Sequence, residues 1–143
     1  MILRRGTSII EIVIATALIS VSIISALSLA NHTQKQNTYA KNLAEATKYT
    51  TQASDWIRTQ RNDLGWATLA AKDSGSYCLN TLPSDFTLIQ DGVCAPGSYM
   101  LNTQFQRNLT IQKPTLESLK FTIEVSWQEQ VARQATLELE LTQ

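Results

Sequence analysis

Histidine and cysteine are scarce in this sequence, which contains one histidine, His32, and two cysteines, Cys78 and Cys94. Nucleophilic catalysis built on histidine needs a nucleophile and an orienting partner, and no such pattern accompanies His32. The three residues also fall short of the ligand set of a zinc site. The aspartates are scattered without the spacing of a calcium-binding loop. We therefore expect no enzymatic activity, no metal site and no cofactor.

Net charge is also absent, because 12 Lys and Arg residues balance 12 Asp and Glu residues. A chain without an overall field has no general attraction for nucleic acid or for an anionic surface. Nucleic acid is therefore not an expected partner.

Glycine and proline are missing between Thr7 and Leu64, and this favours one long helix. From Ile9 to Ala30 the only charged residue is Glu11. As a helix this run would extend roughly 33 Å, enough to cross the hydrocarbon core of a bilayer. Arg4 and Arg5 precede the run, so the positive-inside rule predicts a single-pass protein of the cytoplasmic (inner) membrane with its N-terminus in the cytoplasm.

The second half of the expected helix is amphipathic. Its apolar residues recur at spacings of three, four or eight positions, while charged residues occupy the other positions. This pattern predicts one face that packs on a soluble core. Gly65 is the expected end, although residues 66–71 could add a turn or two. The apolar residues are Tyr39, Leu43, Ala46, Tyr49, Ala53, Trp56 and Leu64.

The last third of the chain alternates apolar and polar residues in three stretches, 105–112, 121–127 and 131–141. Period-two alternation predicts an antiparallel meander with one dry face, which the amphipathic helix would cover. The expected class is α+β, with a sheet of three or four strands. Residues 73–104 are rich in turn formers, with a short strand expected at 86–89. Arg107 and Arg133 share the apolar parity, and we expect both side chains to reach solvent at strand ends.

Cys78 and Cys94 both lie in the part of the chain that the predicted topology exports. An even number of cysteines in an oxidising compartment favours one disulfide between them. Two free buried thiols are the alternative.

The stretch RRGTSIIE at residues 4–11, followed by an apolar helix, resembles the class III signal of type IV pilins and pseudopilins. The resemblance implies that prepilin peptidase cuts between Gly6 and Thr7, and that Thr7 becomes the N-methylated first residue. Glu11 would then be the fifth residue of the mature chain, where the family carries the glutamate that docks on a neighbouring subunit. The expected architecture matches as well, and the loop of Cys78 and Cys94 looks like that of minor pilins of the pilus-modification type.

The resemblance divides the chain into a leader at 1–6, a membrane and filament-core segment at 7–30, an amphipathic helix at 31–72 and a head at 73–143. It implies a structural subunit that waits in the membrane, in contact with lipid, and is then assembled into an extracytoplasmic filament. The implied partners are other pilin or pseudopilin subunits, prepilin peptidase and the membrane assembly platform.

Two features depart from the usual pilin pattern. Thr7 stands where the family usually has phenylalanine or methionine, and no proline precedes Pro83. The missing proline favours a minor pilin or a pseudopilin over the main structural subunit.

Two alternatives remain at the level of the sequence. The filament could belong to a type II secretion or DNA-uptake system instead of a pilus. Alternatively, Ser28-Leu29-Ala30 fits the cleavage site of an ordinary signal peptide, and the product would then be an exported binding module that begins at Asn31.

Overall fold

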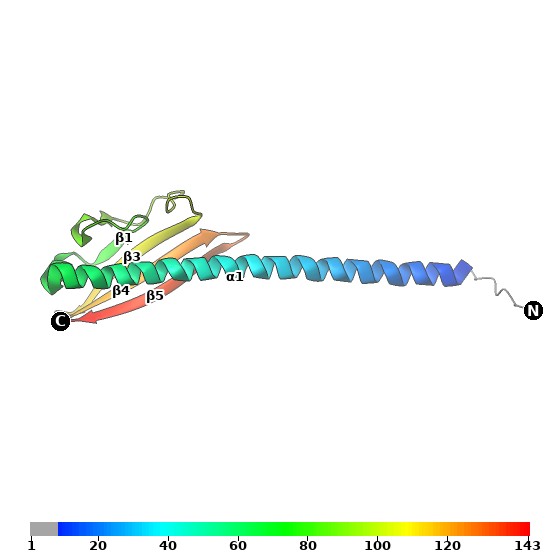
Figure 1. The fold of residues 1–143 in the computed structure, drawn as a ribbon, viewed down its shortest axis with the longest axis horizontal. Helices are drawn as coiled ribbons and strands as arrows, with labels where there is room; N and C mark the ends of the chain where they lie inside the picture. Colours follow the sequence, from blue (N-terminus) through cyan, green and yellow to red (C-terminus); the bar gives the residue numbers. More distant parts are fainter. Residues whose placement is uncertain (1–8) are drawn as a thin grey trace, which may run out of the picture. The chain divides into compact units, whose positions relative to one another are not determined.

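A computed structural model describes residues 9–143, in which a long helix is followed by an antiparallel sheet (Figure 1). The chain divides into two compact units, Met1–Lys41 and Asn42–Gln143. The predicted α+β class is confirmed. The elements in order are α1 (Ile9–Ala71), β1 (Gly75–Cys78), the short 3₁₀ helix η1 (Phe86–Leu88), β2 (Gln90–Asp91), β3 (Phe105–Thr115), β4 (Ser118–Gln128) and β5 (Ala132–Thr142).

Helix α1 is interrupted once, at Gly65, the residue where the sequence predicts its end. Gly65 has φ 79° and ψ 167°, a conformation that costs glycine little and any other residue much more. A built Cβ would meet no atom within 4 Å, so the backbone conformation, not crowding, selects glycine there. The helix then resumes and ends at Ala71, which confirms the additional turns after Gly65.

The sheet contains five strands within residues 9–143, in the order β2-β1-β3-β4-β5, and all neighbours pair antiparallel. The expected count of three or four was too low because the turn-rich segment before β3 contributes two short strands, β1 and β2. The long meander of β3, β4 and β5 follows the predicted alternation, with Phe105 opposite Trp127 and Phe121 opposite Leu139.

The short strand expected at 86–89 was wrong. Phe86–Leu88 form a 3₁₀ turn, because the Asp85 carboxylate accepts a hydrogen bond from the Thr87 backbone N–H and caps it. Phe86 itself is fully buried in the main core.

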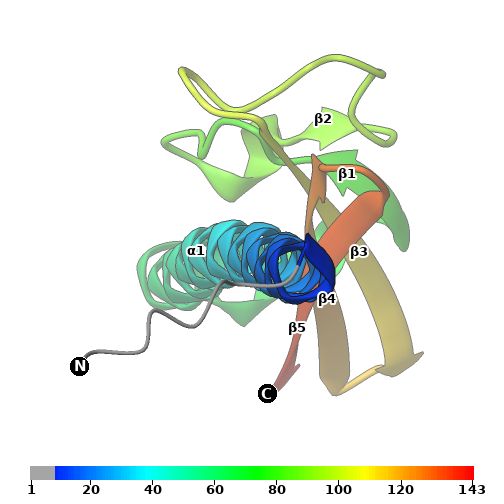
Figure 2. The ribbon, with the colours of Figure 1, turned by 90° about the vertical axis from the view of Figure 1, so that its right-hand side faces the viewer.

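The core lies between one face of the sheet and the Asn42–Ala71 part of α1, which covers that face (Figure 2). Ala46 and Ala53 are fully buried, on the side of the helix that faces the sheet. Ile57 and Leu69 are the largest fully buried side chains of the helix. Two clusters result, one around Phe86 and Phe121 and another that joins Ala46 to strand residues. The second cluster contains Ala46, Met100, Phe105, Val125 and Trp127.

We predict that Phe121→Ala destabilises the head by about 3 to 5 kcal/mol, the usual cost of removing a buried aromatic ring. Phe121 is 0% exposed, and its ring meets that of Phe86 edge to face with centroids 6.1 Å apart. Urea unfolding followed by near-UV circular dichroism measures the change. Thr122→Ala on the opposite face of β4 is the matched control, and equal losses from the two variants would contradict this core.

Candidate functional site

The first candidate site is the apolar N-terminal part of α1, with Glu11 in its first turn. Every side chain from Ile9 to Lys41 is exposed, including large apolar ones such as Ile9, Leu18 and Ile24. This helix is long and apolar enough to cross a membrane, and it lies near the N-terminus. An exposed apolar surface of this length is typical of a segment that contacts lipid or other protein.

Four hydroxyl side chains of this segment donate to carbonyls of their own helix. The hydroxyl of Ser20 donates to the Thr16 carbonyl at 2.8 Å, and those of Ser22 and Ser25 donate to the carbonyls four residues earlier at 2.8 Å and 2.9 Å. The Thr16 hydroxyl donates to the Val13 carbonyl. Because these groups need no water partner, they add little to the cost of placing the segment in an apolar environment.

Glu11 differs from these hydroxyls. Within residues 9–143 its carboxylate forms no hydrogen bond or ion pair. A carboxylate at the centre of a bilayer costs about 2.5 to 3.5 kcal/mol on insertion scales, and less near the surface. Glu11 is therefore a charge in an apolar surface with room for an external cationic partner. The cleavage and methylation positions, Gly6 and Thr7, lie outside the described residues.

The second candidate site is the loop region of the head, where Cys78 and Cys94 form a disulfide. The alternative of two free thiols is thereby excluded. The bridge joins β1 to the loop that follows β2, and the Cys94 backbone N–H donates to the side-chain oxygen of Asn108 on β3 at 2.8 Å. Closing a loop of this size contributes about 3 kcal/mol to stability in the chain-entropy account.

Arg107 is buried beneath these loops, and the expectation that it reaches solvent was wrong. Its side chain is 2% exposed, with Nε donating to the Leu79 carbonyl at 2.8 Å and Nη1 to the Tyr49 carbonyl at 3.1 Å. Burial lowers the pKa of Arg107 to about 10, so the guanidinium remains charged at neutral pH. Alternation alone places Arg107 among apolar residues, and carbonyl oxygens from α1 and the loop replace the water that it loses.

Glu129, in the turn between β4 and β5, connects that turn to α1. Its Oε1 accepts hydrogen bonds from the Asn42 side-chain amide and from the Trp127 indole N–H, both at 2.8 Å. Gln104 extends the network by donating to the Asn42 side-chain oxygen at 3.1 Å. The hydrogen bonds from Asn42 and Trp127 lower the pKa of Glu129. Sequence reasoning missed this network, because nothing in the local pattern brings positions 42, 104 and 129 together.

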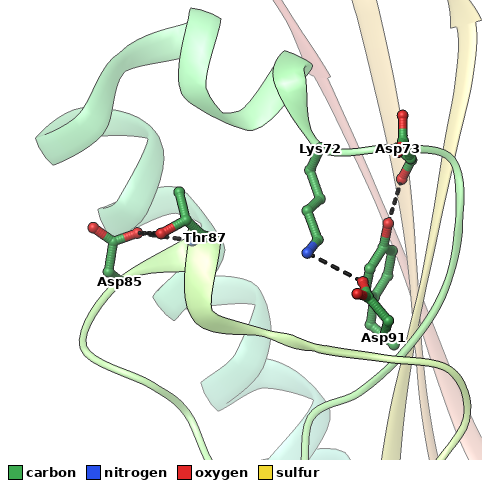
Figure 3. A network of polar contacts seen from close by, with 6 residues as sticks. Lys72, Asp73, Asp85, Thr87 and Asp91 are labelled. Carbon is green, nitrogen blue, oxygen red and sulfur yellow. Dashed lines mark hydrogen bonds and ion pairs between the residues drawn. The ribbon is translucent and has the colours of Figure 1, made fainter.

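A second polar network ties the end of α1 to the short strands (Figure 3). Lys72 Nζ lies 3.2 Å from an Asp91 carboxylate oxygen and 4.9 Å from the centroid of the Tyr77 ring. The Tyr77 hydroxyl donates to the Asp73 carbonyl at 2.7 Å, and burial raises the pKa of Tyr77. At Asp85, the hydrogen bond from the Thr87 backbone lowers the carboxyl pKa. These contacts hold the loops in place.

One pocket of about 470 Å³ opens beside the disulfide. Its lining is uncharged, and the exposed side chains of Leu88 and Tyr99 contribute to it. No group of three or more His, Cys, Asp or Glu side chains within the described part of the chain could hold a metal ion. The lining residues are Cys78, Asn80, Thr81, Pro83, Leu88, Ile89, Gln90, Ser98 and Tyr99.

We predict that Glu129→Gln removes part of the acid sensitivity of the head. The folded-state pKa of Glu129 lies below its ordinary value of 4.5, so the network's stabilisation is present above that value and is lost as the pH falls through the folded pKa. Urea unfolding at a series of pH values from 7 down to 3 measures the unfolding free energy of each variant. The difference in unfolding free energy between wild type and Glu129→Gln should shrink towards low pH, whereas Glu117→Gln serves as the exposed control. A difference that is constant with pH would contradict the ionic role.

Comparison of the chain with known protein families, with curated proteins and with solved structures finds no match. Function is therefore inferred from the residues themselves. The two features that carry such an inference are Glu11 in its apolar helical surface and the helix-on-sheet head with its Cys78–Cys94 bridge.

Proposed function

We propose that this protein is a minor pilin or pseudopilin, a structural subunit that is cut by prepilin peptidase and assembled into a type IV pilus-like filament. The observation that carries the proposal is a single carboxylate, Glu11, in the first turn of an exposed apolar helix. The sequence resemblance of residues 4–11 to the prepilin signal supports the same role.

The proposed role of Glu11 is to form an ion pair with a cationic group of a neighbouring subunit in an apolar medium. Cleavage between Gly6 and Thr7 would create a free amine on each mature subunit. The amine of one subunit and the Glu11 carboxylate of its neighbour would then attract each other strongly, because hydrocarbon screens charge poorly. One charge pair in a long apolar surface also sets the register of two helices, since sliding either helix breaks the pair.

The remaining surface of the segment suits close helix packing. Ala15, Ser22 and Ala26 are small, so neighbouring helices could approach closely along them. Ser22 uses its hydroxyl within its own helix and therefore does not need a partner across the interface. Before assembly the same surface would lie in lipid as a single span with a cytoplasmic N-terminus.

In this proposal the head of residues 73–143 is displayed outside the membrane. Its disulfide suits an oxidising compartment. Type II secretion and DNA-uptake systems use the same helix chemistry, so both remain within the proposal. The expected partners are other pilin or pseudopilin subunits, the membrane assembly platform and prepilin peptidase.

We predict that Glu11→Gln leaves membrane insertion intact and lowers incorporation into filaments about tenfold. A loss of roughly 1.4 kcal/mol in docking corresponds to that factor, within the range measured for polar contacts between membrane helices. Membrane fractionation measures insertion, and immunoblotting of sheared filaments measures incorporation. Glu11→Asp should retain part of the incorporation because it keeps the charge.

Ser20→Ala is the matched control from the same segment, because it removes a polar group that is already satisfied within the helix. It should insert and assemble like the wild type. If Glu11→Gln assembled equally well, the docking role would be rejected.

We predict that the mature protein begins at Thr7 and that Gly6→Ala blocks this processing. N-terminal sequencing and mass spectrometry of the membrane-extracted protein test both points, and co-expression with and without prepilin peptidase is the control. A mature chain that begins at Asn31 would identify an ordinary signal peptide. That result would replace the filament subunit with an exported binding module.

A further inference from the structure

The two edges of the sheet differ greatly in length. β2 forms one edge with two residues, whereas β5 forms the other with the whole stretch Ala132–Thr142 (Figure 2). β5 pairs with β4 without a register shift from Gln128↔Ala132 to Ser118↔Thr142. Within residues 9–143, no strand pairs with the outer side of β5.

Two hydrogen bonds identify the residues of β5 that point outward. The Gln143 backbone N–H donates to the Glu117 carbonyl at 3.0 Å, so Glu117 and Gln143 are a hydrogen-bonded pair. Hydrogen-bonded and non-hydrogen-bonded pairs alternate in antiparallel sheets. The even-numbered residues of β5 therefore direct their backbone N–H and C=O groups away from β4. Arg61 agrees with this assignment, because its Nη2 donates to the outward carbonyl of Thr142 at 2.6 Å.

The exposed edge lacks most of the usual protection against pairing, and keeps only the charges of Arg133, Glu138 and Glu140. Native sheets blunt their edges with proline, lysine, bulges or very short strands. β5 contains no proline and no lysine, is unbroken in register and is long. Its outward-pointing residues also have exposed side chains, so an incoming strand would meet little steric obstruction. These residues are Gln134, Thr136, Glu138 and Glu140.

The charges on this edge favour one kind of partner. Glu138 and Glu140 lie on the same exposed face, where Lys120 bridges Glu138 at 3.0 Å and lies opposite Glu140. A second copy of β5 is a poor partner. Directly opposed residues share a face, and the even positions of β5 include no basic residue to meet the glutamates.

We propose that the free edge of β5 binds an extended segment of another protein in which basic and apolar residues alternate, so that the segment adds a strand to the sheet. Backbone hydrogen bonds to the even-numbered residues would hold the segment, as in other complexes formed by strand addition. Its Lys or Arg side chains would lie beside Glu138 and Glu140. Its apolar side chains would continue the covered face that Leu139 and Leu141 line.

The test uses the full chain in a non-ionic detergent and a capped seven-residue peptide of alternating valine and lysine. Fluorescence anisotropy should show saturable binding, and hydrogen exchange should slow at the amides of Gln134, Thr136, Glu138 and Glu140. Two control peptides separate the contribution of charge to binding from that of backbone hydrogen bonding. Replacing lysine by glutamate tests charge, and N-methylation of the amides along one edge tests backbone pairing. Each change should weaken binding at least tenfold.

Two sets of variants make the test specific. Thr136→Pro removes an outward N–H, which an edge strand tolerates, and should abolish peptide binding while the unfolding midpoint changes little. Reversing both charges, Glu138→Lys with Glu140→Lys, should transfer the preference to the glutamate peptide. Glu124→Lys on the neighbouring strand β4 is the matched control and should leave the lysine peptide preferred.

The proposal is overturned if the N-methylated peptide binds as well as the parent, because binding would then be charge attraction alone. It is also overturned if the even-numbered amides exchange at an unchanged rate in the complex. Peptide capture needs only groups of β5, so its failure would leave the proposed role of Glu11 untouched, and failure of Glu11 to dock would not affect the edge.

Discussion

The packing of the Asn42–Ala71 part of α1 on one face of the sheet is the constraint on which the head depends. A single amphipathic helix must cover a meander of three long strands and two short ones. The helix contributes Ala46, Ala53, Ile57 and Leu69 to this core, and all four side chains are fully buried. Two polar contacts add to this packing. The hydrogen bond between Asn42 and Glu129 joins the helix to the turn between β4 and β5, and the ion pair between Lys72 and Asp91 joins the end of the helix to β2.

Two charged groups in apolar surroundings, Arg107 and Glu11, meet the cost of desolvation differently. Arg107 is enclosed by the head, and main-chain carbonyls from α1 and the loop after β1 replace its water. That arrangement is complete within the chain and therefore structural. For Glu11, no hydrogen bond or ion pair within residues 9–143 offsets the cost in this way. This contrast makes Glu11 the stronger indicator of function, because a chain keeps an uncompensated charge where a partner supplies the other half.

The same reasoning separates the two edges of the sheet. At β2 the edge is short, and the disulfide and the Lys72–Asp91 ion pair fasten the loops around it. At β5 the backbone groups of the even-numbered residues point away from β4 and pair with no strand within residues 9–143, although Arg61 caps the Thr142 carbonyl. The β5 edge is therefore the side of the sheet on which another protein strand would pair most readily. It adds a second surface for association to the apolar surface of α1.

By itself the sequence determined the long helix, the break in its helical geometry at Gly65 (predicted there as the end of the helix), the three long strands and the helix-on-sheet packing. Each of these follows from local periodicity or from the conformational freedom of one residue. It also identified Glu11, because a charge in an apolar run is visible without any structure. Only the tertiary structure decided the short strands β1 and β2, the 3₁₀ turn at Phe86, the burial of Arg107 and the Asn42–Glu129 contact. These depend on groups far apart in the chain that replace each other's water, and no local pattern records such pairings.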